Sequence, residues 1–342
     1  MDSSVSTKIK EFLELQVASD DFSGSVLVMH DKLPILEYSF GFSNNDKNER
    51  NTIDTIYNIG SMDKMFTAVA IAQLVEQKKI SFEDEVSKYF PQYPNGEITI
   101  DQILTHKDGL KSYFNDKYIK ERLNLKTVND FIDLFIHESL LFEPGEKYQY
   151  SNSGYVLLGG IIEKVTGMSY YDYVCGHVFK PSNMIHTGSY AIDDANNPVA
   201  HGYTNRLPFS KNIAEGERRD NISDLPYRGS PAGGGYSTSI DLYNFSQALL
   251  GYILLSKKMT GVILSPKVTI GTKDSTTLYY GYGFQILKSG KQFRYGHAGG
   301  FAGVNTRLDM YPNLNYVSVV LSNYDEPAAF RVANKIGEII GF

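Results

Sequence analysis

The sequence predicts an α/β fold in which one antiparallel sheet is assembled from both ends of the chain, flanked by N- and C-terminal helices. Strand-type patterns occur at 25–40 and return at 282–322. Apolar residues at helical spacing fill the middle of the chain. Because strands at both ends must share one sheet, we expect a sheet part from residues 1–60 and 231–342, with a mainly helical part inserted at 61–230.

The N-terminal end predicts a helix followed by a β-hairpin. Apolar residues lie on one helical face at Val5, Ile9, Phe12, Leu13 and Val17. Two short apolar runs, 25–29 and 35–40, flank the turn residues Asp31 and Lys32, a pattern typical of a hairpin. A polar loop at 43–51 is expected to follow.

The middle of the chain predicts helices around a buried one. From Ser61 to Val75 apolar residues cover nearly every face, which indicates a helix enclosed by protein. Further helices are expected at 100–105, 128–138 and 155–166, the last closed by Gly167. The polar segment 196–232 predicts either an excursion that faces the substrate or a mobile lid.

The C-terminal third predicts an antiparallel meander and a closing helix. Short β-branched or aromatic runs occur between turn residues at 282–287, 292–295, 303–310 and 316–322. Phe330, Ala333, Ile336 and Ile340 then share one helical face. A cleft between the sheet part and the helical part is the expected place for a site.

Composition excludes several classes of protein. The 342 residues carry 33 Lys and Arg against 39 Asp and Glu, a net charge of −6, so no basic surface is expected for a nucleic-acid partner. The single cysteine, Cys175, cannot form an internal disulfide and is expected to be an inert core residue. We expect no membrane span and no secretion signal, hence a cytoplasmic chain as it stands, or an extracytoplasmic one if a signal has been removed. The oligomeric state is left open.

A serine and a lysine three residues apart begin the buried helix. Ser61 and Lys64 would lie one turn apart on the same face, which places the amine beside the hydroxyl. A serine hydroxyl becomes a nucleophile when a base takes its proton, and a desolvated lysine can serve as that base. The helix N-terminus adds a backbone amide that can stabilise an oxyanion. The alternative is a helix cap with a lysine that extends to solvent.

Two further segments favour the catalytic interpretation. Tyr150-Ser151-Asn152 ends a loop and opens a helix, which presents a phenol and an amide two residues apart. A lysine and a tyrosine together make a proton relay. The glycine-rich segment 295–300, which contains His297, is expected between two late strands, where a substrate can bind backbone amides.

Together these motifs resemble those of the serine hydrolases that include class C β-lactamases, penicillin-binding DD-peptidases, D-aminopeptidases and related esterases. The motifs are Ser61-x-x-Lys64, Tyr150-Ser151-Asn152 and His297-Ala298-Gly299. Family-like blocks in the family's order, at 98–110, 144–160, 231–238 and 281–284, extend the resemblance over most of residues 20–325. The resemblance implies a β-lactamase/transpeptidase-like fold.

The resemblance also implies roles for single residues. Ser61 would be the acylated nucleophile, with Lys64 and Tyr150 sharing the work of general base and acid. Asn152 would bind the amide carbonyl of the substrate. The backbone amides of Ser61 and Gly300 would form the oxyanion hole, in which one donor contributes about 10²–10³-fold in rate.

The third motif and the segment after His106 depart from the family pattern. His297 stands where β-lactamases of this family carry lysine. Histidine, with a reference pKa of about 6.5, is expected to be partly charged near neutral pH, so we expect inefficient β-lactamase activity and a pH-dependent rate that reports His297 charging. His297 and Gly299 are expected to bind substrate. Lys107-Asp108 stands where the family more often has small hydroxyl residues.

The expected function is hydrolysis through an acyl-enzyme on Ser61, as a DD-peptidase or D-amino-acid peptidase acting on a small-molecule or peptide substrate. One alternative is an esterase or acyltransferase on a small ester or thioester. An alternative of another class is a non-catalytic penicillin-binding-like protein that binds a ligand or partner. The segments 111–126 and 196–232 are expected to set substrate choice.

The remaining histidines, the cysteine and the other tyrosines are not expected to take part in catalysis. His106 is interpreted as a hydrogen-bonding histidine at a helix end. No histidine or cysteine has a partner at metal-ligand spacing, so neither a metal nor a cofactor is expected. Four tyrosines are candidates for lining the substrate pocket: Tyr148, Tyr155, Tyr236 and Tyr282.

Overall fold

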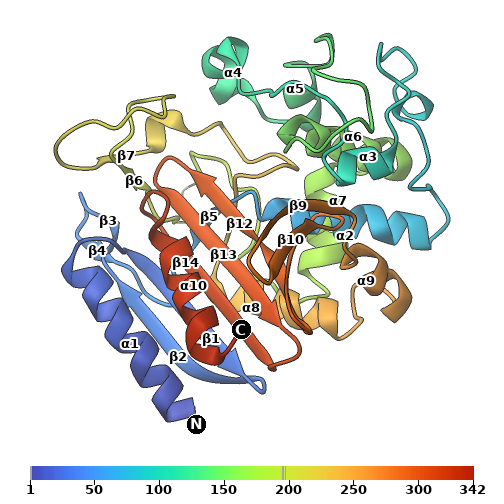
Figure 1. The fold of residues 1–342 in the computed structure, drawn as a ribbon. Coiled ribbons are helices and arrows are strands. Elements are labelled where there is room, and N and C mark those ends of the chain that lie inside the picture. Colours follow the sequence, from blue (N-terminus) through green and yellow to red (C-terminus); the bar gives the residue numbers. More distant parts are fainter. Residues whose placement is uncertain (1, 195, 197) are drawn as a thin grey trace.

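An antiparallel sheet of eight strands forms the centre of the described part of the chain, in the order β2-β1-β14-β13-β12-β11-β10-β9 (Figure 1). The computed structural model describes residues 2–194, 196 and 198–342. The strands are β1 Gly24–His30, β2 Leu33–Phe40, β9 Val268–Lys273, β10 Thr276–Tyr280, β11 Gln285–Ser289, β12 Gln292–Phe301, β13 Val304–Tyr311 and β14 Tyr316–Ser322. The two ends of the chain meet where β1 pairs with β14, with Val26 opposite Val320. The predicted fold class is thereby confirmed.

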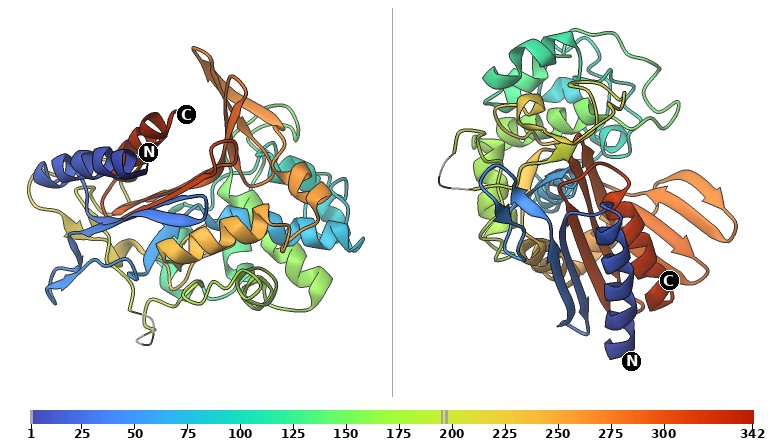
Figure 2. Two further views of the ribbon diagram at one scale, coloured as in Figure 1. Left: turned by 90° about the horizontal axis from the view of Figure 1, so that it is seen from below. Right: turned by 90° about the vertical axis from the view of Figure 1, so that its left-hand side faces the viewer.

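The terminal helices cover one face of the sheet. Helix α1 (Asp2–Ala18) and helix α10 (Ala328–Ile340) lie side by side on it (Figure 2). Ile9 and Leu13 of α1 pack with Val332 and Ile336 of α10 against the sheet. Because the apolar residues of both helices recur every three or four positions, each buries one stripe and leaves the opposite side in water.

The other face of the sheet carries the remaining helices around helix α2 (Asp63–Glu76). Every residue from 63 to 74 is buried, as the apolar run predicts. Neighbouring helices are α6 Asn152–Thr166, α7 Tyr170–Val174, α8 Ser239–Leu250 and α9 Lys257–Ile263. Shorter helices are α3 Ile100–Leu104, α4 Asp116–Glu121, α5 Val128–Ile132, η1 Val86–Lys88, η2 Arg122–Asn124, η3 Cys175–Phe179 and η4 Ile222–Asp224.

Three two-stranded ribbons complete the described elements. They pair β3 (Phe42–Asn44) with β4 (Glu49–Arg50), β5 (Tyr57–Gly60) with β8 (Gly235–Ser237), and β6 (Tyr203–Thr204) with β7 (Arg219–Asp220). Strand β5 also packs on β12 and β13 and leads directly into α2. It therefore carries the chain from the sheet to the buried helix.

Most predicted elements are present at the expected places. The first helix, the hairpin, the buried helix, the C-terminal meander and the last helix are confirmed, and Gly167 ends α6 with a φ of 71°. The segment 43–51 is partly a ribbon rather than a loop, and the helix expected at 128–138 ends at Ile132. Strands β9 and β10 were not predicted, because their mostly exposed or half-buried residues give no clear apolar alternation.

The glycine-rich segment 295–300 does not lie between two strands but continues β12 to Phe301. Its glycines are required by close packing rather than by a turn. A Cβ on Gly296 would lie 1.8 Å from the carbonyl oxygen of Leu308, and one on Gly299 would lie 1.9 Å from that of Ile59. Strand glycines of this kind mark a close approach of backbone and are easily mistaken for a strand end.

The expected boundaries of the sheet part and the helical part remain a prediction. Three residues lie outside the described part of the chain: residue 1, in the expected sheet part, and residues 195 and 197, in the expected helical part. Residue 197 also belongs to the expected loop 196–232. None of the described helices is long and apolar enough to cross a membrane. Cys175 is exposed, which corrects its expected place in the core.

Candidate active site

Ser61 lies in the tight turn between β5 and α2. The preceding Gly60 has a φ of 53°, and a Cβ there would lie 2.8 Å from the backbone nitrogen of Gly300. The Gly60 carbonyl accepts a hydrogen bond of 3.2 Å from the backbone of Gly234. The turn is thus held between β12 on one side and the segment before β8 on the other, which fixes the half-buried Ser61 next to Gly300.

Lys64 lies in the first turn of α2 and is completely buried. Its Nζ donates to Oδ1 of Asn152 at 2.6 Å and to the carbonyl of Ala232 at 2.5 Å, and it lies 4.8 Å from the centre of the Tyr150 ring. Burial lowers the pKa of Lys64 to about 7, although the neighbouring Asp63 raises it in part. A neutral amine has two N–H groups and one lone pair, so these two acceptors leave the lone pair for a proton.

Asp63, between the serine and the lysine, is a site residue that the sequence analysis missed. Its buried carboxylate accepts a hydrogen bond of 2.6 Å from the backbone of Gly235. Burial raises the pKa of Asp63 to about 7, against the lowering effect of that hydrogen bond and of Lys64. A Cβ on Gly235 would lie 2.5 Å from the carboxylate, so only glycine fits there. The only sequence signal for Asp63 was its place between Ser61 and Lys64.

Tyr150-Ser151-Asn152 leads into α6 as predicted. The Ser151 hydroxyl caps the helix by accepting a bond of 3.2 Å from the backbone of Gly154, and Asn152 begins the helix facing Lys64. Tyr150 as a whole is 39 % exposed, but its phenol lies among the site residues. There burial raises the pKa of Tyr150, and a hydrogen bond with Ser61 lowers it.

His106 supports the Tyr150-Ser151-Asn152 motif by a hydrogen bond, in agreement with the structural role predicted for it. Its buried ring accepts a bond of 3.0 Å at Nδ1 from the backbone of Ser151, so the proton sits on Nε2. Among the described residues Nε2 has no hydrogen-bond partner, and the ring packs against Tyr150 and Tyr280 with centroids 4.4 and 4.5 Å away. Burial lowers the pKa of His106 well below its ordinary value. His106 is therefore a neutral support.

Asp108 places a buried carboxyl behind the same motif. Its Oδ1 accepts a bond of 2.8 Å from the backbone of Leu110, while Oδ2 has no hydrogen-bond partner in the described part of the chain. A Cβ on Gly154 of α6 would lie 2.6 Å from Oδ2. Burial raises the pKa of Asp108 to about 7, and hydrogen bonds from Leu110 and Ser151 lower it. Asp108, one of the two residues that depart from the family pattern, thus packs against the helix that the Tyr150 motif begins.

His297 is buried in β12, and its environment corrects the expectation that it is partly charged. Nδ1 donates to the carbonyl of Ala298 at 2.7 Å, and Nε2 accepts from the hydroxyl of Tyr280 at 2.8 Å. Burial, together with the nearby Lys64, lowers the pKa of His297 to about 3. The ring is therefore neutral at physiological pH, because both nitrogens are already hydrogen-bonded and burial disfavours the charged form.

Ser61, Asn152 and Gly300 border one cavity of about 610 Å³. Lys64, Tyr150, Gly299 and His297 do not border it. Residues from both segments expected to set substrate choice line the cavity, including Tyr113, Phe114, Tyr118 and Ile119 from 111–126 and Arg206, Phe209 and Lys211 from 196–232.

The aromatic lining of this cavity differs from the prediction. Tyr148, Tyr155, Tyr236 and Tyr282 do not border it. The aromatic side chains that do are Tyr113, Phe114, Tyr118, Phe131, Phe209 and Phe301. Several of them come from loops, where no periodicity marks which side chains face a cleft. No cluster of side chains suited to a metal ion occurs among the described residues.

Ser61 at the start of a buried helix, its hydrogen bond with Tyr150, and a fully buried Lys64 one turn along the helix are the features of a serine hydrolase. A family model described as Beta-lactamase matches residues 9–339, and the chain belongs to this family.

Related proteins agree with this assignment. A penicillin binding protein from Bacillus halodurans superposes with a TM-score of 0.86 at 31 % identity, covering 96 % of this chain and 98 % of that one. The teichoic acid D-alanine hydrolase of Staphylococcus aureus is 27 % identical over 97 % of this chain and 77 % of its own length. A D-stereospecific amidohydrolase from Streptomyces sp. is 25 % identical with a TM-score of 0.78, covering 98 % of both chains.

Proposed function

We propose that this chain cleaves an amide or ester bond next to a D-amino acid residue through an acyl-enzyme on Ser61, as a DD-peptidase or D-amino-acid peptidase. The observation that carries the proposal is the state of Lys64. It is fully buried, its pKa is lowered to about 7, and both N–H groups of its neutral form have acceptors. In its neutral form, which is well populated near pH 7, such an amine can take the serine proton.

The reaction would proceed in two transfers of the acyl group. Ser61 Oγ attacks the substrate carbonyl as its proton passes to the Lys64 and Tyr150 pair. The oxyanion is bound by the backbone amides of Ser61 and Gly300. Collapse breaks the bond to the leaving amine or alkoxide, which takes the proton back from the pair. Water then repeats the sequence on the ester of Ser61, which releases the acid and restores the serine.

Asn152 would hold the substrate as well as the lysine. Its Oδ1 is occupied by Lys64, so the amide NH₂ of the same side chain is the end left to donate to a substrate carbonyl. Because Asn152 begins α6 and borders the cavity, a bound carbonyl would lie next to Ser61. One side chain thereby couples the position of the base to the position of the substrate.

The preference for D-amino acids is supported by the relatives. One of them is named a teichoic acid D-alanine hydrolase and another a D-stereospecific amidohydrolase. The neutral His297 supports peptidase over β-lactamase work, because a lysine at this position would offer a cation to the carboxylate of a penicillin. We therefore expect a penicillin to acylate Ser61 and to be released slowly.

A stereochemical panel tests this function. Matched D- and L-alanine and phenylalanine amides and esters, together with D-alanyl-D-alanine peptides, are offered to the protein and to Ser61→Ala. We expect turnover of the D-compounds at least about tenfold above the L-compounds, which is about 1.4 kcal/mol, and its loss in Ser61→Ala. Turnover of esters without stereochemical preference or peptide cleavage would favour the esterase or acyltransferase alternative. Binding without Ser61-dependent turnover would favour the non-catalytic one.

A further inference from the structure

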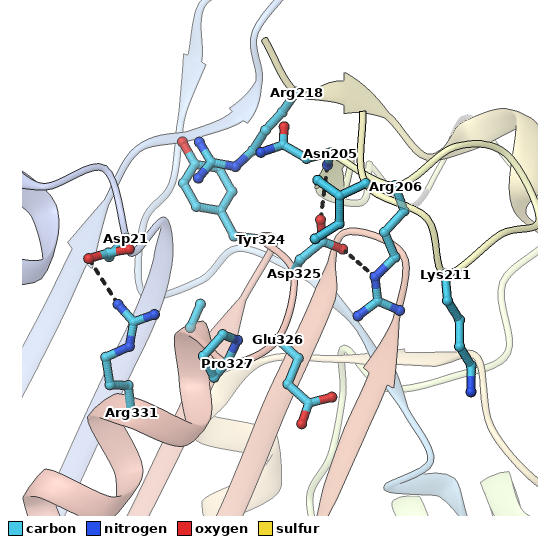
Figure 3. A pocket seen from close by; sticks show the side chains of 12 residues that line it. Asp21, Asn205, Arg206, Lys211, Arg218, Tyr324, Asp325, Glu326, Pro327 and Arg331 are labelled. Atoms are coloured by element: carbon cyan, nitrogen blue, oxygen red, sulfur yellow. Dashed lines mark hydrogen bonds and ion pairs between the residues drawn. The ribbon is translucent and has the colours of Figure 1, made fainter. Parts of the chain in front are cut away.

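The outer end of the active-site cavity carries charged side chains that the reaction does not use. Arg206, Lys211 and Glu326 border the 610 Å³ cavity and also a second cavity of about 480 Å³ beside it (Figure 3). A site that extends past Ser61 toward these residues can hold far more than a single amino acid. The same three residues therefore form the junction between the two cavities.

Arg206 is fixed at this junction through Asp325. The Asp325 carboxylate accepts bonds from the Thr204 hydroxyl at 2.9 and 2.8 Å, from the backbone of Asn205 at 3.0 Å and from the backbone of Gly303 at 2.9 Å. Arg206 forms an ion pair with the same carboxylate at 3.5 Å. Because Gly303 follows the strand that carries Gly300, Asp325 links the charged junction to the candidate oxyanion hole.

The other cations of the second cavity already have partners. Arg218 is paired with Asp20 and lies 3.9 Å from the centre of the Tyr324 ring. Arg331 is paired with Asp21 at 2.9 Å (Figure 3). The charge of this cavity is therefore largely neutralised away from the junction.

Lys211 and Glu326 differ from these pairs. In the described part of the chain neither side chain has an ion pair or hydrogen bond, and they are not paired with each other. Figure 3 shows both side chains pointing away from Arg218 and Tyr324, with the guanidinium of Arg206 between them in this view. One cavity thus presents a free cation and a free anion on either side of a fixed guanidinium.

We propose that this junction is a subsite for a zwitterionic end of the substrate, in which Lys211 and Arg206 bind a carboxylate and Glu326 binds an ammonium group. The inference rests on the proposed function and names its substrate class. The substrate is a peptide or peptide-like compound with a D-amino acid at the cleaved bond and a free amino-acid group at its far end. A cation pair and an anion in one subsite disfavour substrates whose end carries one charge or none.

The test uses D-alanyl substrates that differ only in one end group: ammonium with carboxylate, carboxylate alone, ammonium alone, or methyl. The end group is placed on the acyl side in one series and on the leaving-group side in a second. In one series we expect kcat/KM for the zwitterion to exceed that for the methyl compound about tenfold, with the excess falling at high salt.

Two variants test the two charges separately, and a third serves as a control. Lys211→Gln should lower kcat/KM about three- to tenfold for the carboxylate-bearing compounds relative to the others, and Glu326→Gln should do so for the ammonium-bearing ones. Lys273→Gln, on the exposed strand β9 and outside both cavities, should leave these ratios unchanged. Equal rates for all four end groups, or variants that change all four alike, would overturn the subsite.

The experiment distinguishes failure of the proposed function from failure of the subsite. Absence of Ser61-dependent turnover of the methyl compound would refute the proposed function. Binding of the same four compounds to Ser61→Ala, measured by calorimetry, then still reports on the junction. Tighter binding of the zwitterion that Lys211→Gln and Glu326→Gln each weaken would uphold the subsite, and equal binding of all four compounds would refute it.

Discussion

The inner site and the rim of the cavity are built in opposite ways. Lys64 at the inner site lies in a buried helix with two hydrogen-bond acceptors, and Asn152 is held by it. At the rim, Phe114 and Phe209 are 44 % and 41 % exposed, and Lys211 has no side-chain partner in the described part of the chain. Groups that move protons are fixed by packing, whereas groups that meet different substrates lie on exposed segments.

This difference predicts that changes at the inner site affect the reaction itself, whereas changes at the rim affect the choice of substrate. The inner groups are coupled, since Asn152 and Lys64 share a hydrogen bond and Asp108 and His106 support the same motif. Rim residues contact substrate one by one, so their effects should be smaller and should differ between substrates.

The largest effect is expected at the buried base. Lys64→Met keeps the volume and removes the amine, so kcat/KM for an activated D-alanyl ester should fall at least about 10³-fold. The fold should survive, because an apolar side chain costs little where a lysine was fully buried. Steady-state kinetics and thermal unfolding check both statements. Activity within tenfold of wild type would show that Lys64 is not the base.

The pH profile should report Lys64 rather than His297. Since the amine must be neutral to accept a proton, kcat/KM should rise with pH through about 7 and then level off. His297→Gln should lower the rate about tenfold, but it should leave the midpoint in place, because the histidine is neutral over this range. A midpoint that moves in this variant would show that the charge on His297 matters.

A smaller effect on stability is expected at Asp108. Burial raises its pKa in the folded state to about 7 from 3.8, so the folded state binds the proton more tightly and stability falls as pH rises between these values. Asp108→Asn keeps the acceptor for Leu110 without the charge. At pH 8 it should be about 2–4 kcal/mol more stable than wild type, with the gain shrinking toward pH 5. Urea unfolding at several pH values measures the difference in free energy of unfolding between the variant and wild type. A difference that does not change with pH would contradict the presence of a buried Asp108 charge.

The smallest effect is expected at the rim. Phe114→Ala should reduce the preference for a phenylalanyl over an alanyl substrate about three- to tenfold, since it removes apolar surface from one side of the cavity. Competition between the two substrates in one reaction measures the ratio directly. A uniform loss on both substrates would place Phe114 in the inner site instead.

Much of the fold followed from the sequence because long elements have strong periodicity. The buried helix after Ser61 and the strands β13 and β14 of the meander are examples, since nearly every residue of them is buried. The segment 295–300 was misplaced because glycine was interpreted as a strand end, whereas Gly296 and Gly299 sit inside β12 where two backbones meet. Sequence patterns carry no direct information on such contacts.

The site was predicted in part. Ser61, Asn152 and Gly300 border one cavity, Lys64 is hydrogen-bonded to Asn152 and Tyr150 to Ser61, although the roles of the predicted site residues remain predictions. The charge state of His297 was wrong, because it depends on burial and on Lys64, which are distant in sequence. Asp63 was missed, and Asp108 was noted only as a departure from the family pattern, since a carboxylate is usually exposed and only the fold shows these two buried.

The central claim is that Ser61 carries the acyl group. The most direct measurement is an intact-mass time course with a penicillin and with an activated D-alanyl ester, followed by peptide mapping, beside Ser61→Ala. We predict an adduct of one acyl group on the peptide that contains Ser61, released slowly for the penicillin and absent in the variant. An adduct elsewhere, or turnover that persists in Ser61→Ala, would contradict the account.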